Sequence, residues 1–98
     1  MKQIVLLLGS NIDNRLELLA SACSLILKQI GPIVAASSIY ESDPWGYDSN
    51  NPFLNQAVLI KTRFSPEKVL EKCLSIEAQL GRTRNENGTY ADRNIDID

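Results

Sequence analysis

The alternation of strand-like and helix-like segments limits how this chain can fold more than any other feature. Continuous apolar or β-branched runs predict strands, and apolar residues at three- and four-residue steps predict helices. The segments follow one another as 4–8 (strand), 13–30 (helix), 33–40 and 53–62 (strands), 65–80 (helix) and a last strand from Asn94. This β-α-β-β-α-β order predicts an α+β sandwich of ferredoxin-like arrangement, with an antiparallel sheet, both helices on one face and a final strand cut short.

Short signals mark the ends of these segments. The unbroken apolar run of the first strand predicts burial on both faces, and Gly9-Ser10-Asn11 predicts a turn after it. Gly31-Pro32 should end the first helix, and Ser65-Pro66 should begin the second. The expected apolar stripes are Leu16, Leu19, Ala20, Cys23, Leu27 and Ile30 on the first helix, and Val69, Leu70, Cys73, Ile76 and Leu80 on the second.

Length and composition exclude several classes of protein. The 98 residues suffice for a single domain, and the net charge of −2 gives no reason to expect nonspecific binding to nucleic acid or to an anionic membrane. No histidine is present for acid–base chemistry or metal ligation. The two cysteines match no zinc pattern and predict buried, reduced thiols in a cytoplasmic protein. The first apolar run is too short to span a membrane and lacks a signal-peptide cleavage site.

Two carboxylates near the end of the sequence predict a metal site. Asp96 and Asp98 alternate with Ile95 and Ile97. On a strand the isoleucines would be buried on one face, and the acids would share the other face about 7 Å apart at their backbones. Carboxylate oxygens at this spacing suit Mg²⁺. The alternative is a solvated acidic tail, but in such a tail the two isoleucines would stay exposed and would add no stability.

Three arginines close to these acids indicate a phosphate site. Arg82 and Arg84 follow the second helix, and Arg93 precedes the acids. Guanidinium groups bind phosphate oxygens bidentately, so the cluster indicates chemistry on a nucleoside triphosphate. The alternative is a set of surface ion pairs, which contribute little to stability. Glu77 is either an ordinary acid at the edge of a helix or an acceptor for a nucleotide, and taken alone it favours the former.

A possible site for a heterocycle lies at the start of the third strand. Asn55 stands where asparagine is disfavoured, and its amide offers both a donor and an acceptor. Phe53 lies on the same strand face, where its ring could stack on a ligand. The alternative is an asparagine that caps a strand beside a core phenylalanine. In the preceding polar stretch, Pro44-Trp45-Gly46 is either a lid or a turn held by one aromatic side chain.

Taken in order, the short motifs of this chain resemble the 6-hydroxymethyl-7,8-dihydropterin pyrophosphokinase family of folate biosynthesis. They are Gly9-Ser10-Asn11, Ser37-Ser38-Ile39-Tyr40, Pro44-x-Gly46, Phe53-Leu54-Asn55-Gln56-Ala57, Ile76-Glu77, Gly81-Arg82-Thr83-Arg84 and Arg93-x-x-Asp96-Ile97-Asp98. Only the last motif is specific by itself, but the ordered set runs along the whole chain. The resemblance implies transfer of the β,γ-diphosphate of ATP to the hydroxymethyl group of a dihydropterin, with release of AMP.

The resemblance also implies a role for each matching residue. Two Mg²⁺ ions would be held by Asp96 and Asp98. The catalytic residues that neutralise the triphosphate would be Arg82, Arg84 and Arg93. The pterin would be bound by Ser42, Pro44, Trp45, Gly46, Phe53 and Asn55. The nucleotide would be bound by Glu77, Arg84, Tyr90 and Arg93.

Members of that family continue well beyond the two aspartates. Residues 1–98 are therefore expected to form one pyrophosphokinase-like domain without its C-terminal part, and to show little or no turnover alone. The alternative, from another class, is a non-catalytic ferredoxin-like module that binds a small ligand or another subunit. Such a module needs the same strand order but not the arginine–aspartate cluster. RNA binding on the sheet is disfavoured, because the strands lack paired exposed aromatics and the chain is slightly acidic.

Overall fold

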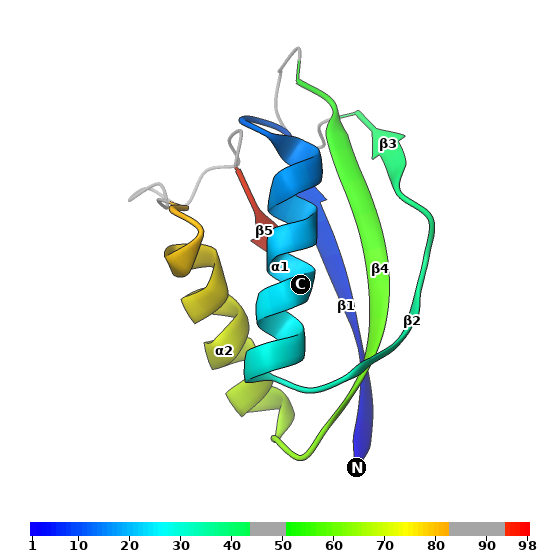
Figure 1. Cartoon of the computed structure of the whole chain (residues 1–98), viewed down its shortest axis with the longest axis vertical. Coiled ribbons are helices and arrows are strands. Elements are labelled where there is room, and N and C mark those ends of the chain that lie inside the picture. The colour runs from blue at the N-terminus through cyan, green and yellow to red at the C-terminus, as the bar shows by residue number, and fades with distance from the viewer. Residues whose placement is uncertain (44–50, 83–93) are drawn as a thin grey trace.

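The computed structural model describes residues 1–43, 51–82 and 94–98. In chain order its elements are β1 (Lys2–Ser10), α1 (Arg15–Gln29), β2 (Ile33–Ala36), β3 (Tyr40–Ser42), β4 (Phe53–Thr62), α2 (Pro66–Gln79) and β5 (Asp96–Ile97) (Figure 1). The predicted order of helices and strands is confirmed, with one predicted strand divided into β2 and β3. No helix in the described part of the chain is long and apolar enough to cross a membrane.

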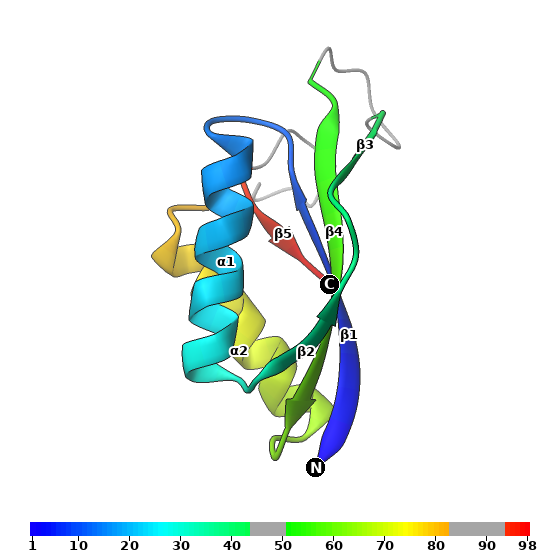
Figure 2. The ribbon, with the colours of Figure 1, turned by 45° about the vertical axis from the view of Figure 1, so that its right-hand side comes forward.

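The strands form one antiparallel sheet in the order β2-β4-β1-β5, and β3 pairs with β4 beyond the end of β2. The two central strands, β1 and β4, pair continuously from Lys2↔Thr62 to Ser10↔Leu54. Both helices pack on the same face of the sheet (Figure 2). This arrangement confirms the ferredoxin-like α+β prediction, including the short last strand at one edge.

The core lies between the helices and the covered face of the sheet. On β1, Leu6 and Leu8 point into this layer and are 3% and 2% exposed, whereas Val5 and Leu7 are 58% and 52% exposed. The prediction that this strand is buried on both faces is therefore wrong for the described residues, because the helices cover one face only. The uncovered face carries Asn55 and Asp96, two of the described residues that the sequence singles out for chemistry.

The predicted stripe of helix α1 is correct only in part, since Leu19 and Ile30 are buried as predicted. The buried residues within the helix are Leu19, Ala22 and Ile26, spaced three and four apart. Leu16 and Leu27, which the pattern placed in the stripe, are 59% and 57% exposed. The helix carries apolar residues on more than one side, and contact with the sheet and with α2 decides which side is buried.

The predicted helix ends are confirmed. Helix α1 ends at Gln29, just before Gly31-Pro32. Helix α2 begins at Pro66 after the N-cap Ser65, whose side chain accepts a hydrogen bond from the Lys68 N–H. Its buried residues are Val69, Cys73, Ile76 and Glu77. Leu70 is 57% exposed, so its place in the predicted stripe is wrong.

Two predicted strand boundaries differ from the structure. Strand β1 continues through residue 10, so Gly9-Ser10-Asn11 is not a turn, and the chain reverses around Asp13, which has a φ of 66°. The predicted strand 33–40 is interrupted at Ser37. There the Ser37 hydroxyl accepts the Ala57 N–H at 2.9 Å, and the Ser37 N–H donates to the Ala57 carbonyl at 2.8 Å. Regular pairing resumes at Tyr40.

Candidate active site

Four strands contribute one row of residues across the uncovered face of the sheet. Gly9 of β1 pairs with Asn55 of β4 on one side and with Asp96 of β5 on the other, and Asn55 pairs in turn with Tyr40 of β3. Directly paired residues project to the same face of an antiparallel sheet. The row therefore joins segments from the beginning, middle and end of the chain.

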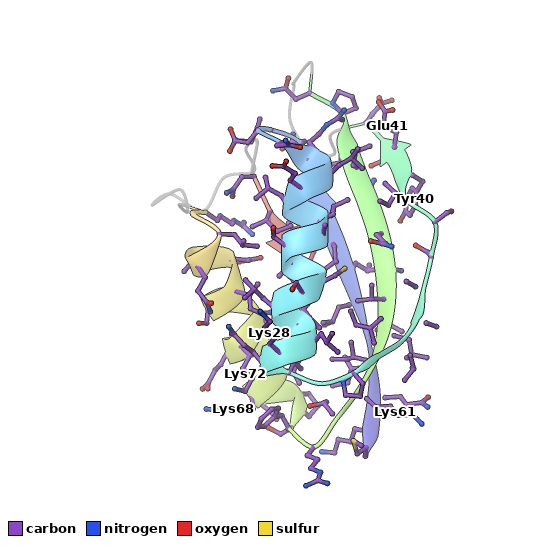
Figure 3. All side chains as sticks on the ribbon, in the orientation of Figure 1. Lys28, Tyr40, Glu41, Lys61, Lys68 and Lys72 are labelled. Carbon is purple, nitrogen blue, oxygen red and sulfur yellow. The ribbon has the colours of Figure 1, made fainter. Side chains whose placement is uncertain are left out.

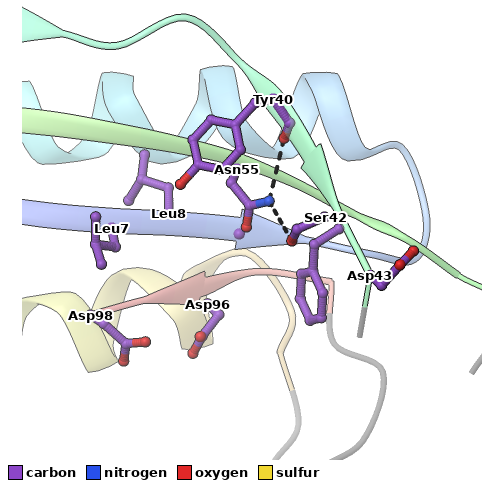
Figure 4. A pocket seen from close by; sticks show the side chains of 10 residues that line it. Leu7, Leu8, Tyr40, Ser42, Asp43, Asn55, Asp96 and Asp98 are labelled. Atoms are coloured by element: carbon purple, nitrogen blue, oxygen red, sulfur yellow. Dashed lines mark hydrogen bonds between the residues drawn. The ribbon is translucent and has the colours of Figure 1, made fainter. Parts of the chain in front are cut away.

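This row forms the base of a pocket of about 360 Å³ (Figure 4). The lining residues are Leu7, Leu8, Gly9, Tyr40, Ser42, Asp43, Phe53, Asn55, Asp96 and Asp98. One end of the pocket carries aromatic and amide side chains together with Asp43, and the other end carries Asp96 and Asp98 (Figure 4). A pocket of this composition suits a small molecule with a polar ring at one end and a metal-bound anion at the other. It brings together Ser42, Phe53, Asn55, Asp96 and Asp98, which the sequence singled out separately.

The side chain of Asn55 is oriented by the neighbouring strand β3. Its Nδ2 donates to the Ser42 Oγ at 2.8 Å and to the Tyr40 carbonyl at 3.3 Å (Figure 4). Its Oδ1 lies above Gly9, 3.4 Å from where a Cβ would stand, and Phe53 Cδ1 lies 3.3 Å from the same point. The amide nitrogen of Asn55 is thus held by hydrogen bonds to β3, and its Oδ1 can act as an acceptor beside the Phe53 ring.

Asp96 and Asp98 lie next to each other at the acidic end (Figure 4). Ile95 and Ile97 are buried on the helix side, 0% and 3% exposed, as the alternation predicted. Burial raises the pKa of the Asp98 carboxyl, and the charge and hydrogen bonding of Asp96 and the charge of Glu77 raise it further, against the opposing effect of Arg82. Two carboxylates held this close repel each other as anions, so the pair favours a bound cation or a shared proton.

Arg82 links the acid pair to helix α2. Its Nη1 donates to Asp96 Oδ1 and to Glu77 Oε2, both at 2.8 Å, and to the Ile95 carbonyl at 3.2 Å. Its Nε is buried, and within the described part of the chain it has no hydrogen-bond partner. Glu77 is 2% exposed and is therefore not an ordinary acid at the edge of a helix. Its predicted contact with a nucleotide stays a prediction.

The donor set at the acidic end fits Mg²⁺. Asp96 and Asp98 supply hard carboxylate oxygens, which this ion prefers. Within residues 1–43, 51–82 and 94–98, no group of three or more histidine, cysteine, aspartate or glutamate side chains is placed to hold a metal ion by itself. Magnesium sites on phosphate substrates commonly use one or two carboxylates, and the substrate oxygens complete the coordination.

Several predicted site residues lie outside the described residues: Pro44, Trp45, Gly46, Arg84, Tyr90 and Arg93. Their predicted roles stay predictions.

The labelled lysines, Lys28, Lys61, Lys68 and Lys72, lie toward the end of the molecule away from Tyr40 (Figure 3). They are therefore poorly placed to balance phosphate charge in the pocket.

Comparison with known proteins identifies the family. Residues 5–98 match the family described as 7,8-dihydro-6-hydroxymethylpterin-pyrophosphokinase (HPPK). The chain belongs to this family. Over 96 residues it is 41% identical to the 2-amino-4-hydroxy-6-hydroxymethyldihydropteridine pyrophosphokinase of Porphyromonas gingivalis, covering 97% of this chain and 65% of that protein.

Two further HPPK relatives carry the same name. The protein of Methylorubrum extorquens is 45% identical over 92 residues, which cover 93% of this chain and 57% of the relative. The protein of Bacillus subtilis is 44% identical over 92 residues, which cover 93% of this chain and 54% of the relative. The chain thus spans between about half and two thirds of the length of these curated relatives.

Some residues that line the pocket of this HPPK chain had no role predicted from the sequence. Tyr40 and Gly9 belonged to the motifs, but only strand pairing places them in one row with Asn55. The available signal was the two-residue spacing of Tyr40 and Ser42, which puts both on one face of a strand. Both cysteines are free, and Cys73 is buried as predicted, whereas Cys23 is only half-buried, so the prediction of burial is wrong for Cys23.

Proposed function

We propose that this chain is part of an enzyme that transfers diphosphate from ATP to the hydroxymethyl group of 6-hydroxymethyl-7,8-dihydropterin and releases AMP, a step in folate biosynthesis. The observation that carries the proposal is the row of Tyr40, Asn55, Gly9 and Asp96, which sets an aromatic–amide pocket beside an acid pair. The names of the HPPK relatives support it. The free cysteines suit the cytoplasmic location expected from the sequence.

The pterin would occupy the aromatic and amidic end of the pocket. Phe53 would stack on the ring, and the Asn55 Oδ1 would accept a hydrogen bond from a ring N–H or amino group. Ser42 supports this geometry because its hydroxyl accepts a hydrogen bond from Asn55 at 2.8 Å. Pro44, Trp45 and Gly46 follow Asp43 in the sequence, and we assign their backbone to the same ring.

The triphosphate would occupy the acidic end. Asp96 and Asp98 would hold Mg²⁺, in the two-ion form that the family resemblance implies, and the metal supplies positive charge that neutralises the phosphate oxygens. Arg84, Tyr90 and Arg93 are assigned to the nucleotide. Arg82 would contribute its positive charge to the developing transition state from beside Asp96.

In the reaction, a bond forms between the hydroxymethyl oxygen and the β-phosphorus of ATP. The bond from that phosphorus to the oxygen bridging the α- and β-phosphates breaks, AMP leaves, and the alcohol gives up its proton. Positioning and charge neutralisation carry most of the catalysis in phosphoryl-type transfer. A chain without histidine is compatible with such chemistry.

The decisive experiment incubates the natural protein with ATP, Mg²⁺ and the pterin and measures AMP and ADP separately. We expect AMP only when the pterin is present. Asp96→Asn and Asp98→Asn should lose metal-dependent nucleotide binding, whereas Asp13→Asn, the same change at an exposed residue outside the pocket, should not. ADP in place of AMP would indicate an ordinary kinase. No pterin-dependent product, with binding unaffected by the aspartate variants, would support a non-catalytic binding module.

A further inference from the structure

Glu77 is a buried acid whose contacts point toward the last strand. It lies in the last turn of α2 and is 2% exposed. Its Oε2 accepts two hydrogen bonds of 2.8 Å, one from the Arg82 Nη1 and one from the backbone N–H of Ile97. Ile97 stands between the two acids of the candidate metal site, so a single carboxylate oxygen joins α2 to the centre of that site.

The Ile97 N–H needs a partner because β5 lies at the edge of the sheet. Leu7 and Asp98 exchange backbone hydrogen bonds of 2.7 and 2.9 Å across β1 and β5. In an antiparallel pair, the residue next to such a pair directs its N–H away from the neighbouring strand. Ile97 is 3% exposed, so water does not satisfy this donor. Glu77 supplies the acceptor that this N–H does not find on β1.

The same carboxylate also acts on Asp96 through Arg82. The Arg82 Nη1 that donates to Glu77 donates as well to Asp96 Oδ1 at 2.8 Å and to the Ile95 carbonyl at 3.2 Å. Charge-assisted bonds of this length are among the stronger hydrogen bonds in proteins. Glu77 therefore fixes the backbone beside Asp98 directly and the side chain of Asp96 through one arginine.

The end of α2 is shaped to make these contacts. Gly81 has a φ of 91°, a conformation open to glycine, and the following Arg82 N–H bonds back to the Glu77 carbonyl at 3.0 Å. Asn94 Nδ2 donates to the Leu80 carbonyl at 2.9 Å. The residues that lead into β5 are thus attached to the last turn of α2 at several consecutive positions.

We propose that Glu77 is a positioning residue that sets the relative placement of Asp96 and Asp98 without contacting the nucleotide. The inference rests on the proposed function for its metal, but the contacts of Glu77 do not depend on that function. A direct nucleotide contact would instead require the carboxylate, which is now 2% exposed, to become accessible. The two roles differ in what they predict in the absence of metal.

The test compares Glu77→Gln with Glu71→Gln, the same change at an exposed residue of α2 whose contact is with Lys68. Glutamine keeps the size of the side chain but loses the charge that Arg82 meets. We expect Glu77→Gln to bind Mn²⁺, measured alone by electron paramagnetic resonance, at least about tenfold more weakly. The Ile97 amide should exchange its hydrogen faster, and nucleotide affinity in EDTA should be unchanged. Glu71→Gln should match the wild type in all three.

Weaker nucleotide binding in EDTA, with Mn²⁺ affinity and Ile97 exchange unchanged, would overturn the proposal and make Glu77 a nucleotide ligand. If Glu77→Gln does not fold, the wild type gives the answer by ¹³C NMR of the Glu77 carboxyl. Its signal should not move when nucleotide is added without metal, and a shift there would contradict the proposal. Failure of the proposed function would appear separately, as absence of pterin-dependent AMP, and the Mn²⁺ and amide results would still report on Glu77.

Discussion

Gly9 lies beneath the two side chains at the ring end of the pocket. A Cβ at this position would stand 3.3 Å from Phe53 Cδ1 and 3.4 Å from Asn55 Oδ1. Gly9→Ala should push both side chains away from the positions that bind the ring, at a cost of about 1–3 kcal/mol. We expect the pterin to bind roughly tenfold more weakly or worse, as measured by titration calorimetry.

The control for this change is Ala35→Val, which adds volume at an exposed position of β2 that does not line the pocket. Its pterin affinity should equal that of the wild type. The free energy of unfolding of Gly9→Ala should fall by no more than about 2.5 kcal/mol, because the gain of about 0.5–1 kcal/mol from alanine over glycine inside a strand offsets part of the crowding. Unchanged pterin affinity in Gly9→Ala would mean that the ring does not bind over Gly9.

At the scale of elements, the sequence predicted helix ends better than helix faces. The start of α2 depends on local chemistry, a serine that caps the helix and a proline at its first position, and both are legible in the sequence. The buried face of α1 depends on contacts with strands and with α2 far away in the sequence. Leu27 and Ile26 are similar in hydrophobicity, so periodicity alone did not decide between them.

This difference predicts that truncating two adjacent residues of α1 changes the free energy of unfolding by very different amounts. Ile26 is fully buried, and Leu27 is 57% exposed. Ile26→Ala should lower the free energy of unfolding by about 2–4 kcal/mol, since it removes buried methyl groups and leaves a cavity. Leu27→Ala should change it by less than about 0.5 kcal/mol. Urea unfolding of both variants checks this. A large loss of stability in Leu27→Ala would show that Leu27 is buried, as the stripe predicted from the sequence requires.

At the scale of the whole molecule, the site exists because β1 lies between β4 and β5. The placement of Asp96 and Asp98 on one face followed from their alternation with buried isoleucines, which is local and predictable. The position of Asn55 beside them depends on the register of β1 with both neighbours, which no local pattern gives. For the same reason the burial of Glu77 was not predictable, because its partner at Ile97 is twenty residues away in sequence.

The buried thiol of Cys73 should make the stability of the whole molecule depend on pH in the alkaline range. Burial, followed by the negative charges of Glu77 and Asp98, raises the pKa of its thiol from 9.0 to about 11. Between these values the unfolded chain loses the thiol proton while the folded chain keeps it. The unfolded state then binds fewer protons than the folded state, so the free energy of unfolding falls as the pH rises. The stabilisation is complete below about pH 9 and is lost as the pH rises through about 11.

Urea unfolding of the wild type and of Cys73→Ala across this interval measures the effect. Alanine leaves a cavity that lowers stability by a constant amount at every pH. Between about pH 9 and pH 11, the free energy of unfolding should fall by about 2 kcal/mol more for the wild type than for the variant. This follows because one pKa unit corresponds to about 1.4 kcal/mol. All other ionisable groups are common to both proteins, so their contributions cancel in the difference. Parallel curves would show that the folded chain ionises this thiol as readily as the unfolded chain does, and that burial in the core does not protect it.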